Sequence, residues 1–272
     1  MPNAFARSRL SAAHVLVLML TWILHTTDAA AGQLIEFSTP SGTTSTRLHG
    51  YLAKPDGHGP FPAVVILHGC SGLLPSNTLM AERLKLWGYV ALAIDSLGPR
   101  GRSYACGDGS QDQPVDAYRG LNFLAAQKFV DPDRIGLLGY SMGGGSAMVA
   151  VERGMIEQLF PRKFRAVIAY YPAFCERETG IMTAPTIILI GALDDWTPAQ
   201  ECQEMVKRAS DKGVTIDIIV YPNAYHGFDI TEVPPGWRYM GHRIEYDESA
   251  AKDAWIQSRR FLDGHLAASA KH

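Results

Sequence analysis

One serine of the sequence lies between glycines, in the pattern Gly139-Tyr140-Ser141-Met142-Gly143. The apolar run before this pattern predicts a strand, and the segment after it predicts the start of a helix. A serine on such a strand-to-helix turn forms a nucleophile elbow, which holds the hydroxyl above the edge of a sheet. We therefore predict that Ser141 is a nucleophile. The alternative is a glycine-rich turn that carries a surface serine.

A carboxylate and a histidine follow the serine in the order that such chemistry uses. A serine hydroxyl needs a base to take its proton, and the base needs a group that orients it. Asp194 and Asp195 come directly after one apolar run, and His226 comes after the next. We predict that His226 is the base and Asp194 the orienting acid. Asp195 is the alternative acid, and either aspartate could instead cap the helix that begins near Pro198.

Two backbone N–H groups are candidates to stabilise the oxyanion that forms when a hydroxyl attacks a carbonyl. One belongs to Met142, the residue after the nucleophile, and the other is expected in the loop after an early strand. That loop reads His68-Gly69-Cys70-Ser71-Gly72, and its glycines allow close approach of the backbone. We predict the N–H of Cys70 as the second donor. His68 is a possible base, but it is expected to shape this loop instead. Cys70 is a possible nucleophile, but it lacks the elbow setting of Ser141.

The elements that must position these residues are visible as alternating apolar runs and helix-length segments. Strands are predicted over residues 33–38, 47–53, 63–67, 89–94, 135–138, 166–170, 186–190 and 216–220. Helices are predicted over residues 76–87, 114–127, 142–158, 198–212 and 249–266. Continuous apolar runs indicate strands that are buried on both faces, as in a parallel sheet. We therefore predict an α/β fold with a mostly parallel sheet and helices on both faces. The segment 231–241 is interpreted as a surface loop.

The composition is that of an ordinary globular protein and excludes some classes of partner. The chain has 272 residues, of which 47% are hydrophobic and 19% charged, with a formal net charge of −2. Neither a basic stripe nor a block of like charges stands out, so nucleic-acid binding has no electrostatic support. We expect a single domain over residues 32–272 that needs no metal or organic cofactor.

The N-terminal segment has the three parts of a secretory signal peptide. Arg7 and Arg9 precede an apolar run over residues 15–24, and Ala29-Ala30-Ala31 supplies small residues for cleavage. A membrane anchor is the alternative, but the run is shorter than the roughly 20 residues that a spanning helix needs. We therefore predict a signal peptide over residues 1–31 and a protein that is exported to the periplasm or secreted.

Four cysteines, at positions 70, 106, 175 and 202, fit disulfides in an exported chain. Four cysteines allow three pairings, between which the sequence alone does not choose. The alternative is four buried free thiols. A metal site is not expected, because the cysteines lack the spacing of metal ligands.

The chain resembles the dienelactone hydrolase family over nearly all of residues 32–272. The motifs that carry the resemblance, in order, are residues 91–96 (Ala-Leu-Ala-Ile-Asp-Ser), the Gly139-Tyr140-Ser141 elbow, Tyr171-Pro172, Gly191-x-x-Asp194 with Pro198, and Ala224-x-His226. The resemblance implies an eight-stranded α/β-hydrolase sheet and hydrolysis of lactones or other carboxylic esters. The namesake enzymes of the family carry cysteine at the elbow, where this chain has Ser141.

The fold that the resemblance implies also suggests how the cysteines pair. It places Cys70 near Cys106, and Cys175 near Cys202, at the edge of the sheet that carries the active site. Arg100 is a candidate to meet an anionic substrate, although arginines in loops are usually solvated. Tyr171 and Trp196 are candidates to line the pocket, although aromatic residues are often part of the core.

Together these observations predict a serine hydrolase that forms an acyl-enzyme on Ser141 with a small-molecule ester or lactone. Three alternatives use the same residues: an acyltransferase, a serine peptidase, and a binding protein with an inactive site. The oligomeric state and the natural substrate are not predicted.

Overall fold

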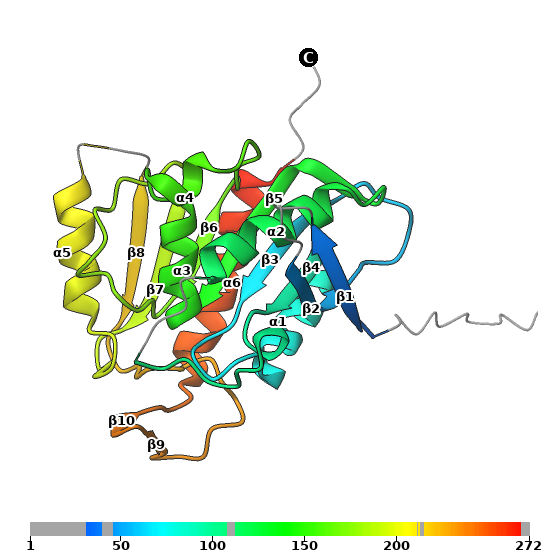
Figure 1. Ribbon diagram of the computed structural model, residues 1–272. Coiled ribbons are helices and arrows are strands. Elements are labelled where there is room, and N and C mark those ends of the chain that lie inside the picture. Colours follow the sequence, from blue (N-terminus) through cyan, green and yellow to red (C-terminus); the bar gives the residue numbers. More distant parts are fainter. Residues whose placement is uncertain (1–30, 40–45, 108–111, 211, 213–214, 268–272) are drawn as a thin grey trace, which may run out of the picture. The chain divides into compact units, whose positions relative to one another are not determined.

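The computed structural model of the chain is built around an eight-stranded sheet (Figure 1). It describes residues 31–39, 46–107, 112–210, 212 and 215–267, which belong to one compact unit. The predicted signal peptide therefore lies, apart from Ala31, outside the described residues. None of the helices in the described part of the chain combines the length and apolar character needed to cross a membrane.

The sheet has the strand order β1-β2-β4-β3-β5-β6-β7-β8. The strands β1 and β2 form an antiparallel pair, β2 runs antiparallel to β4, and the other neighbours are parallel. The bounds of the eight strands are β1 (Gln33–Thr39), β2 (Thr46–Ala53), β3 (Phe61–Leu67), β4 (Val90–Asp95), β5 (Val130–Tyr140), β6 (Val167–Tyr170), β7 (Thr186–Gly191) and β8 (Ile216–Tyr221).

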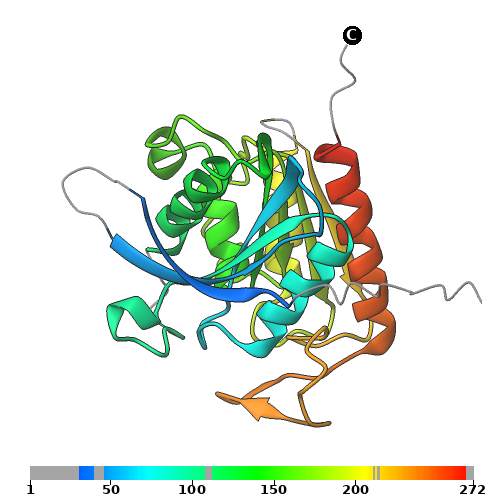
Figure 2. The ribbon, with the colours of Figure 1, turned by 90° about the vertical axis from the view of Figure 1, so that its right-hand side faces the viewer.

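Helices cover both faces of the sheet. The helices α2 and α3 lie on one face, whereas α1 and α6 lie on the other (Figures 1 and 2). The bounds of the helices are α1 (Pro75–Leu86), α2 (Gln113–Ala125), α3 (Met142–Val151), α4 (Met155–Gln158), α5 (Ala199–Ala209) and α6 (Glu248–His265), with a 3-10 turn, η1, over Gly98–Arg100. This arrangement confirms the predicted α/β class with a mostly parallel, doubly covered sheet.

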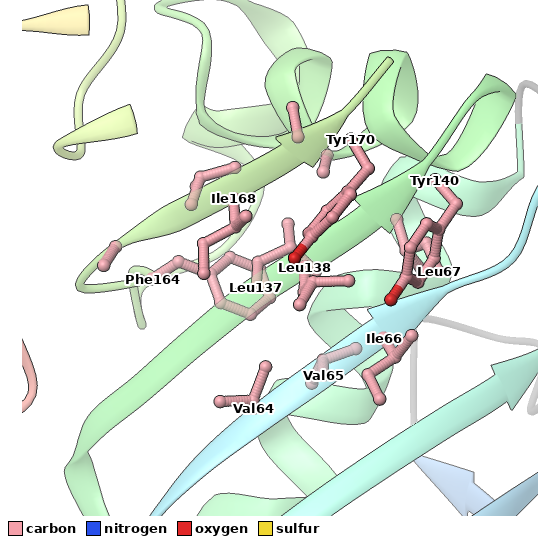
Figure 3. Packing of buried hydrophobic residues seen from close by; sticks show 14 of the residues in the cluster. Val64, Val65, Ile66, Leu67, Leu137, Leu138, Tyr140, Phe164, Ile168 and Tyr170 are labelled. Carbon is pink, nitrogen blue, oxygen red and sulfur yellow. The ribbon is translucent and has the colours of Figure 1, made fainter. Parts of the chain in front are cut away.

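The central strands are apolar along their length because both of their faces are covered. All side chains of residues 64–67 on β3 are fully buried. Figure 3 shows these side chains beside those of β5 and β6, including Leu137, Leu138 and Ile168. The burial of adjacent, not alternate, residues is what the continuous apolar runs of the sequence indicated.

Two segments differ from the sequence-based expectation. The single helix predicted over residues 142–158 is split into α3 and α4, because the intervening residues pair with a distant segment. The N–H of Arg153 donates to the carbonyl of Ile181 (2.8 Å), and Glu152 forms a bridge with Met182. The loop expected over residues 231–241 contributes to a small antiparallel pair, β9 (Arg238–Tyr239) and β10 (His242–Arg243).

The parallel direction of β3, β5, β6, β7 and β8 brings their carboxyl ends to one edge of the sheet. Ligands bind at this edge in open α/β sheets, because the connecting loops can diverge there without disturbing the strands. The residues singled out in the sequence follow four of these strands: His68 after β3, Ser141 after β5, Asp194 after β7 and His226 after β8.

Candidate active site

Ser141 occupies a strained turn between β5 and α3. Its backbone has φ 53° and ψ −118°, which is a conformation that residues with a side chain rarely adopt. The turn also requires glycine on both sides of it. A Cβ atom at Gly139 would collide with the backbone of Gly143, and one at Gly143 would collide with the backbone of residues 67 and 68. The strand-to-helix elbow expected from the sequence is therefore present.

The imidazole of His226 lies between Ser141 and Asp194. Its Nε2 atom is 3.0 Å from Oγ of Ser141, and its Nδ1 atom is 2.8 Å from Oδ2 of Asp194. Only 4% of His226 and 5% of Asp194 is exposed, so water does not compete for these contacts. When Nδ1 carries the proton and is hydrogen-bonded to the carboxylate, the lone pair of Nε2 faces the serine hydroxyl.

The carboxylate of Asp194 is stabilised in its ionised form. Burial by itself would raise the pKa of this carboxyl, but His226 and the N–H groups of Thr197 and Trp196 outweigh burial and lower it. Those two N–H groups donate to Oδ1 (2.8 and 2.9 Å), and the hydroxyl of Thr197 donates to Oδ2 (2.9 Å). A carboxylate that is held in its ionised form in this way fixes the tautomer of His226.

Asp195 takes part in a different set of contacts. Its side chain is exposed, its Oδ1 atom accepts from the N–H of Arg243 (3.1 Å), and its carbonyl lies 2.9 Å from Nδ1 of His242. It therefore anchors the β9–β10 segment, while Asp194 contacts His226.

The loop after β3 lies directly against the elbow. A Cβ atom added to Gly69 would be 3.7 Å from Cβ of Ser141, and Cys70, Met142 and Ser141 line one cavity. Met142 is the first residue of α3, so its N–H has no acceptor within the helix. The two residues predicted to supply N–H donors are thus next to the serine.

His68 is fully buried beneath this loop. Its Nε2 atom accepts from the N–H of Ser96 (3.1 Å), so the proton is on Nδ1, which donates to the carbonyl of Gly69 (2.6 Å). Burial, which outweighs its backbone partners, lowers the pKa of His68. The side chain of Gln113 donates to the carbonyl of His68 (3.0 Å) and accepts from Ser146 (3.0 Å). His68 thus shapes the loop, as the sequence suggested.

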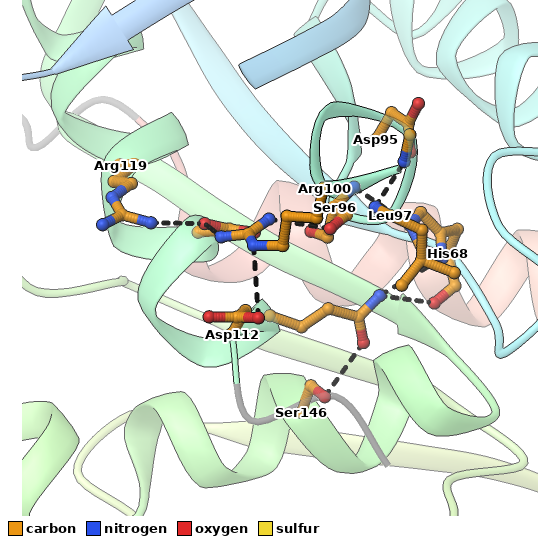
Figure 4. A network of polar contacts seen from close by, with 11 residues as sticks. His68, Asp95, Ser96, Leu97, Arg100, Asp112, Arg119 and Ser146 are labelled. Carbon is orange, nitrogen blue, oxygen red and sulfur yellow. Dashed lines mark hydrogen bonds and ion pairs between the residues drawn. The ribbon is translucent and has the colours of Figure 1, made fainter. Parts of the chain in front are cut away.

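Arg100 belongs to a partly buried ion-pair network and not to a pocket wall. Its guanidinium contacts both carboxylate oxygens of Asp116 (2.8 and 2.9 Å), donates to the carbonyl of Ser96 (2.7 Å), and lies 3.2 Å from Asp112 (Figure 4). Asp116 is fully buried, so the bidentate pair fixes the segment after β4 onto α2. The structure thus corrects the expectation that Arg100 meets the substrate, because the nitrogen atoms of its guanidinium are all paired with groups of the protein.

Two disulfides border the site. Cys70 is bonded to Cys106, and Cys175 to Cys202. The first links the loop after β3 to the segment after η1, and the second links the segment after β6 to α5. These are the pairs that the fold implied in the sequence analysis.

Two cavities open beside Ser141. The larger measures about 250 Å³ and the smaller about 100 Å³. Trp196 lines both cavities, and Tyr171 lines the smaller one. The Tyr171 ring packs on the His226 imidazole with their centroids 4.6 Å apart, and its hydroxyl donates to Asp229 (2.7 Å).

The sequence analysis missed the contributions of Thr197 and Phe174. Thr197 sits three residues after Asp194, a spacing at which an aspartate commonly accepts from the backbone and a hydroxyl, so its role was visible in principle. Phe174 lines the larger cavity from a loop after β6, and no local pattern marks such a residue.

An eight-stranded sheet of this order, with a serine elbow after its central strand β5, defines an α/β hydrolase. Residues 48–266 match the model of the dienelactone hydrolase family, so the chain belongs to that family and is a carboxylic ester hydrolase. This confirms the resemblance found in the sequence.

Curated relatives match most of the chain, and solved structures share its fold. The chain is 25% identical over 241 residues to a probable 2-oxo-3-(5-oxofuran-2-ylidene)propanoate lactonase of Bradyrhizobium sp, which covers 83% of this chain and 92% of the relative. A dienelactone hydrolase-like promiscuous phosphotriesterase from metagenomic libraries superposes with a TM-score of 0.71 at 19% identity, covering 87% of this chain and 99% of that one. Esterase 2 of Thermogutta terrifontis superposes with a TM-score of 0.67 at 19% identity, covering 89% and 98%.

Proposed function

We propose that the protein is a serine hydrolase that cleaves carboxylic esters or lactones through an acyl-enzyme on Ser141. The observation that carries the proposal is the position of the His226 ring, with one nitrogen 3.0 Å from the Ser141 hydroxyl and the other 2.8 Å from the Asp194 carboxylate. Nucleophile, base and orienting acid within hydrogen-bond distance are the geometry that this chemistry requires.

The first half of the reaction acylates the serine. His226 takes the proton of Ser141 on Nε2 as Oγ forms a bond to the substrate carbonyl carbon, and Asp194 stabilises the imidazolium. The N–H groups of Met142 and Cys70 donate to the oxyanion of the tetrahedral intermediate. The carbon–oxygen bond to the alcohol then breaks, and His226 returns the proton to the leaving oxygen.

The second half of the reaction releases the acid. Water takes the place of the alcohol, gives one proton to His226 and bonds to the acyl carbon. The bond to Oγ of Ser141 then breaks, and His226 returns the proton to Oγ. Atoms and charge balance without a further reactant, and the enzyme ends in its starting state.

The decisive experiment compares hydrolysis of a panel of methyl, ethyl and p-nitrophenyl esters by the wild type and by Ser141→Ala. We expect the variant to lose at least about a thousandfold in kcat, because removal of a triad member leaves only binding and the oxyanion donors. Fluorophosphonate labelling of Ser141, located by mass spectrometry, gives an independent readout. Equal activity of the two proteins would refute the assignment of Ser141, and an unlabelled, inactive wild type would indicate a binding protein.

We further propose that the protein is exported. The N-terminal pattern of charge, apolar run and small residues supports this, and so do two disulfides, which persist in oxidising compartments. N-terminal sequencing of the mature protein from the extracytoplasmic fraction tests the proposal, with cleavage expected near Ala31. An intact N-terminus in the cytoplasmic fraction would contradict it.

A further inference from the structure

The two cavities beside Ser141 share some lining residues but differ in the others. Ser141, Cys70 and Trp196 line both, so the cavities meet at the nucleophile. The larger is also lined by Met142, whereas the smaller is also lined by His226. A substrate carbonyl held at Ser141 therefore has one cavity on the side of the helix start and another on the side of the base.

The position of His226 decides which part of an ester each cavity receives. The proton that His226 takes from Ser141 must be passed to the leaving oxygen, so that oxygen must come within hydrogen-bond reach of Nε2. The alcohol must accordingly lie on the side of the smaller cavity. The acyl group stays bonded to Ser141 while water replaces the alcohol next to His226, so it must lie on the other side, in the larger cavity.

The sizes of the cavities limit the two parts unequally. The larger cavity offers about 250 Å³ and the smaller about 100 Å³, so the first has more than twice the space of the second. The larger cavity therefore has room for a bulky acyl group. The smaller one suits a small alcohol.

The walls of the cavities differ in polarity as well as in size. The lining of the smaller cavity contains no lysine, arginine, aspartate or glutamate, and it includes Ile230 and Ile244. The larger cavity has Phe174 and Ala173 in its wall, and its lining also includes the solvent-exposed Arg177, whose Nε is paired with Glu176 (3.0 Å). The outer end of the acyl cavity is therefore open to water and can take a polar substituent, while the alcohol cavity favours an apolar group.

We propose that the preferred substrates are open-chain esters that combine a bulky acyl group, held in the larger cavity, with a small apolar alcohol, held in the smaller one. This rests on the proposed function of Ser141 and His226. Small lactones are disfavoured, because their ring joins the acyl and alkoxy carbons and cannot extend into two separate cavities.

The test uses two isomeric esters that interchange the large and the small part. Methyl phenylacetate and benzyl acetate contain the same atoms, but the first has the bulky acyl group and the second the bulky alcohol. We expect kcat/KM, divided by the rate constant of hydroxide-catalysed hydrolysis, to favour methyl phenylacetate by about 100-fold. A ratio within about threefold, or one that favours benzyl acetate, would overturn the proposal.

A fused lactone, isochroman-3-one, gives the second arm, because it joins the same phenylacetyl and benzyl groups in one ring. After the same correction, we expect it to be a poorer substrate than methyl phenylacetate. A higher corrected kcat/KM for the lactone would overturn the open-chain part of the inference.

Two substitutions assign the groups to the cavities. Ile230 lines the smaller cavity, and Ile230→Ala is expected to raise kcat/KM for benzyl acetate about tenfold, and by more than it changes kcat/KM for methyl phenylacetate. Ala173 lines the larger cavity, and Ala173→Leu is expected to lower the ratio of kcat/KM for methyl phenylacetate to that for ethyl acetate about tenfold. A gain of activity does not arise from misfolding, so the first variant is decisive, and the opposite pattern would reverse the assignment.

Fluorophosphonate labelling of the wild type separates failure of this proposal from failure of the proposed function. If the wild type is labelled by a fluorophosphonate but hydrolyses neither isomer, the division into cavities is wrong while the nucleophile stands. If the wild type is neither labelled nor active, both proposals are wrong.

Discussion

Two histidines, His68 and His226, follow strands of the same sheet and are almost fully buried, yet their surroundings differ. Both ring nitrogens of His68 contact the backbone, at the carbonyl of Gly69 and the N–H of Ser96. Those of His226 contact two side chains, a carboxylate and the hydroxyl of Ser141. Burial is the same in the two cases, so the partners determine what each ring can do. A ring between two backbone groups holds a loop, whereas a ring between a carboxylate and a hydroxyl can move a proton.

The largest expected effect comes from exchanging each histidine for glutamine. His226→Gln should lower kcat at least about 10⁴-fold with little change in the free energy of unfolding, because the base is lost. His68→Gln should lower the free energy of unfolding by about 1–3 kcal/mol, because buried backbone groups lose partners. Ester hydrolysis and urea denaturation of both variants check this. A larger loss of kcat in correctly folded His68→Gln than in His226→Gln would invert the comparison.

The next effect concerns the carboxylate that distinguishes the two rings. Asp194→Asn should lower kcat by about 10³- to 10⁴-fold, because an amide permits the wrong tautomer of His226. Its matched control is Asp195→Asn, since Asp195 contacts Arg243 and not His226, and we expect this variant to stay within about threefold of the wild type. Equal losses in the two variants would show that neither aspartate orients the base.

The loop after His68 is also held by a covalent link, which the His226 segment lacks. Replacing Cys70 and Cys106 together by serine should lower the free energy of unfolding by about 2–4 kcal/mol, because the unfolded chain is then less constrained. Since Cys70 borders the nucleophile, kcat should fall in this variant as well. Replacing Cys175 and Cys202 serves as the control that lowers stability at a distance from the loop. An unchanged free energy of unfolding in both double variants would show that the disulfides are not formed.

The smallest effect is the dependence of stability on pH. Burial lowers the pKa of His68 below its value in the unfolded chain, which is about 6.5. The unfolded chain therefore binds more protons as the pH falls below that value, so the contribution of His68 is complete above it and is lost toward lower pH. Denaturation of the wild type between pH 5 and 8 should show this loss, and His68→Gln should reduce the slope. An equal slope in both proteins would show that a group other than His68 causes the loss of stability.

Much of the fold was predictable because each element has its own local signal. The apolar runs marked the strands, and the glycines around Ser141 marked the elbow, since no larger residue fits there. The order of serine, acid and histidine matched the order in which this fold presents them along the chain. The choice of Asp194 over Asp195 rests on its position in the motif. The structure adds a physical reason, because the N–H and the hydroxyl of Thr197 donate to the carboxylate of Asp194.

The features that were missed depend on contacts between distant parts of the chain. The break between α3 and α4 arises where Arg153 pairs with Ile181. The sequence shows Arg100 only as a loop arginine, because its partner Asp116 lies in the next helix and is buried only once that helix has packed. The cavities are formed by loops from several strands, so neither their volume nor their separation can be deduced from any one segment.

The two disulfides have a consequence for how the protein is made. They join each cysteine to the next one in the chain, with separations of 36 and 27 residues and no interleaving. A chain that crosses a membrane from its N-terminus presents Cys70 and Cys106 first and the other two afterwards. Oxidation in order of appearance then gives the native pairs directly. The proposed export should therefore need an oxidase to form the bonds, but no isomerase to rearrange them.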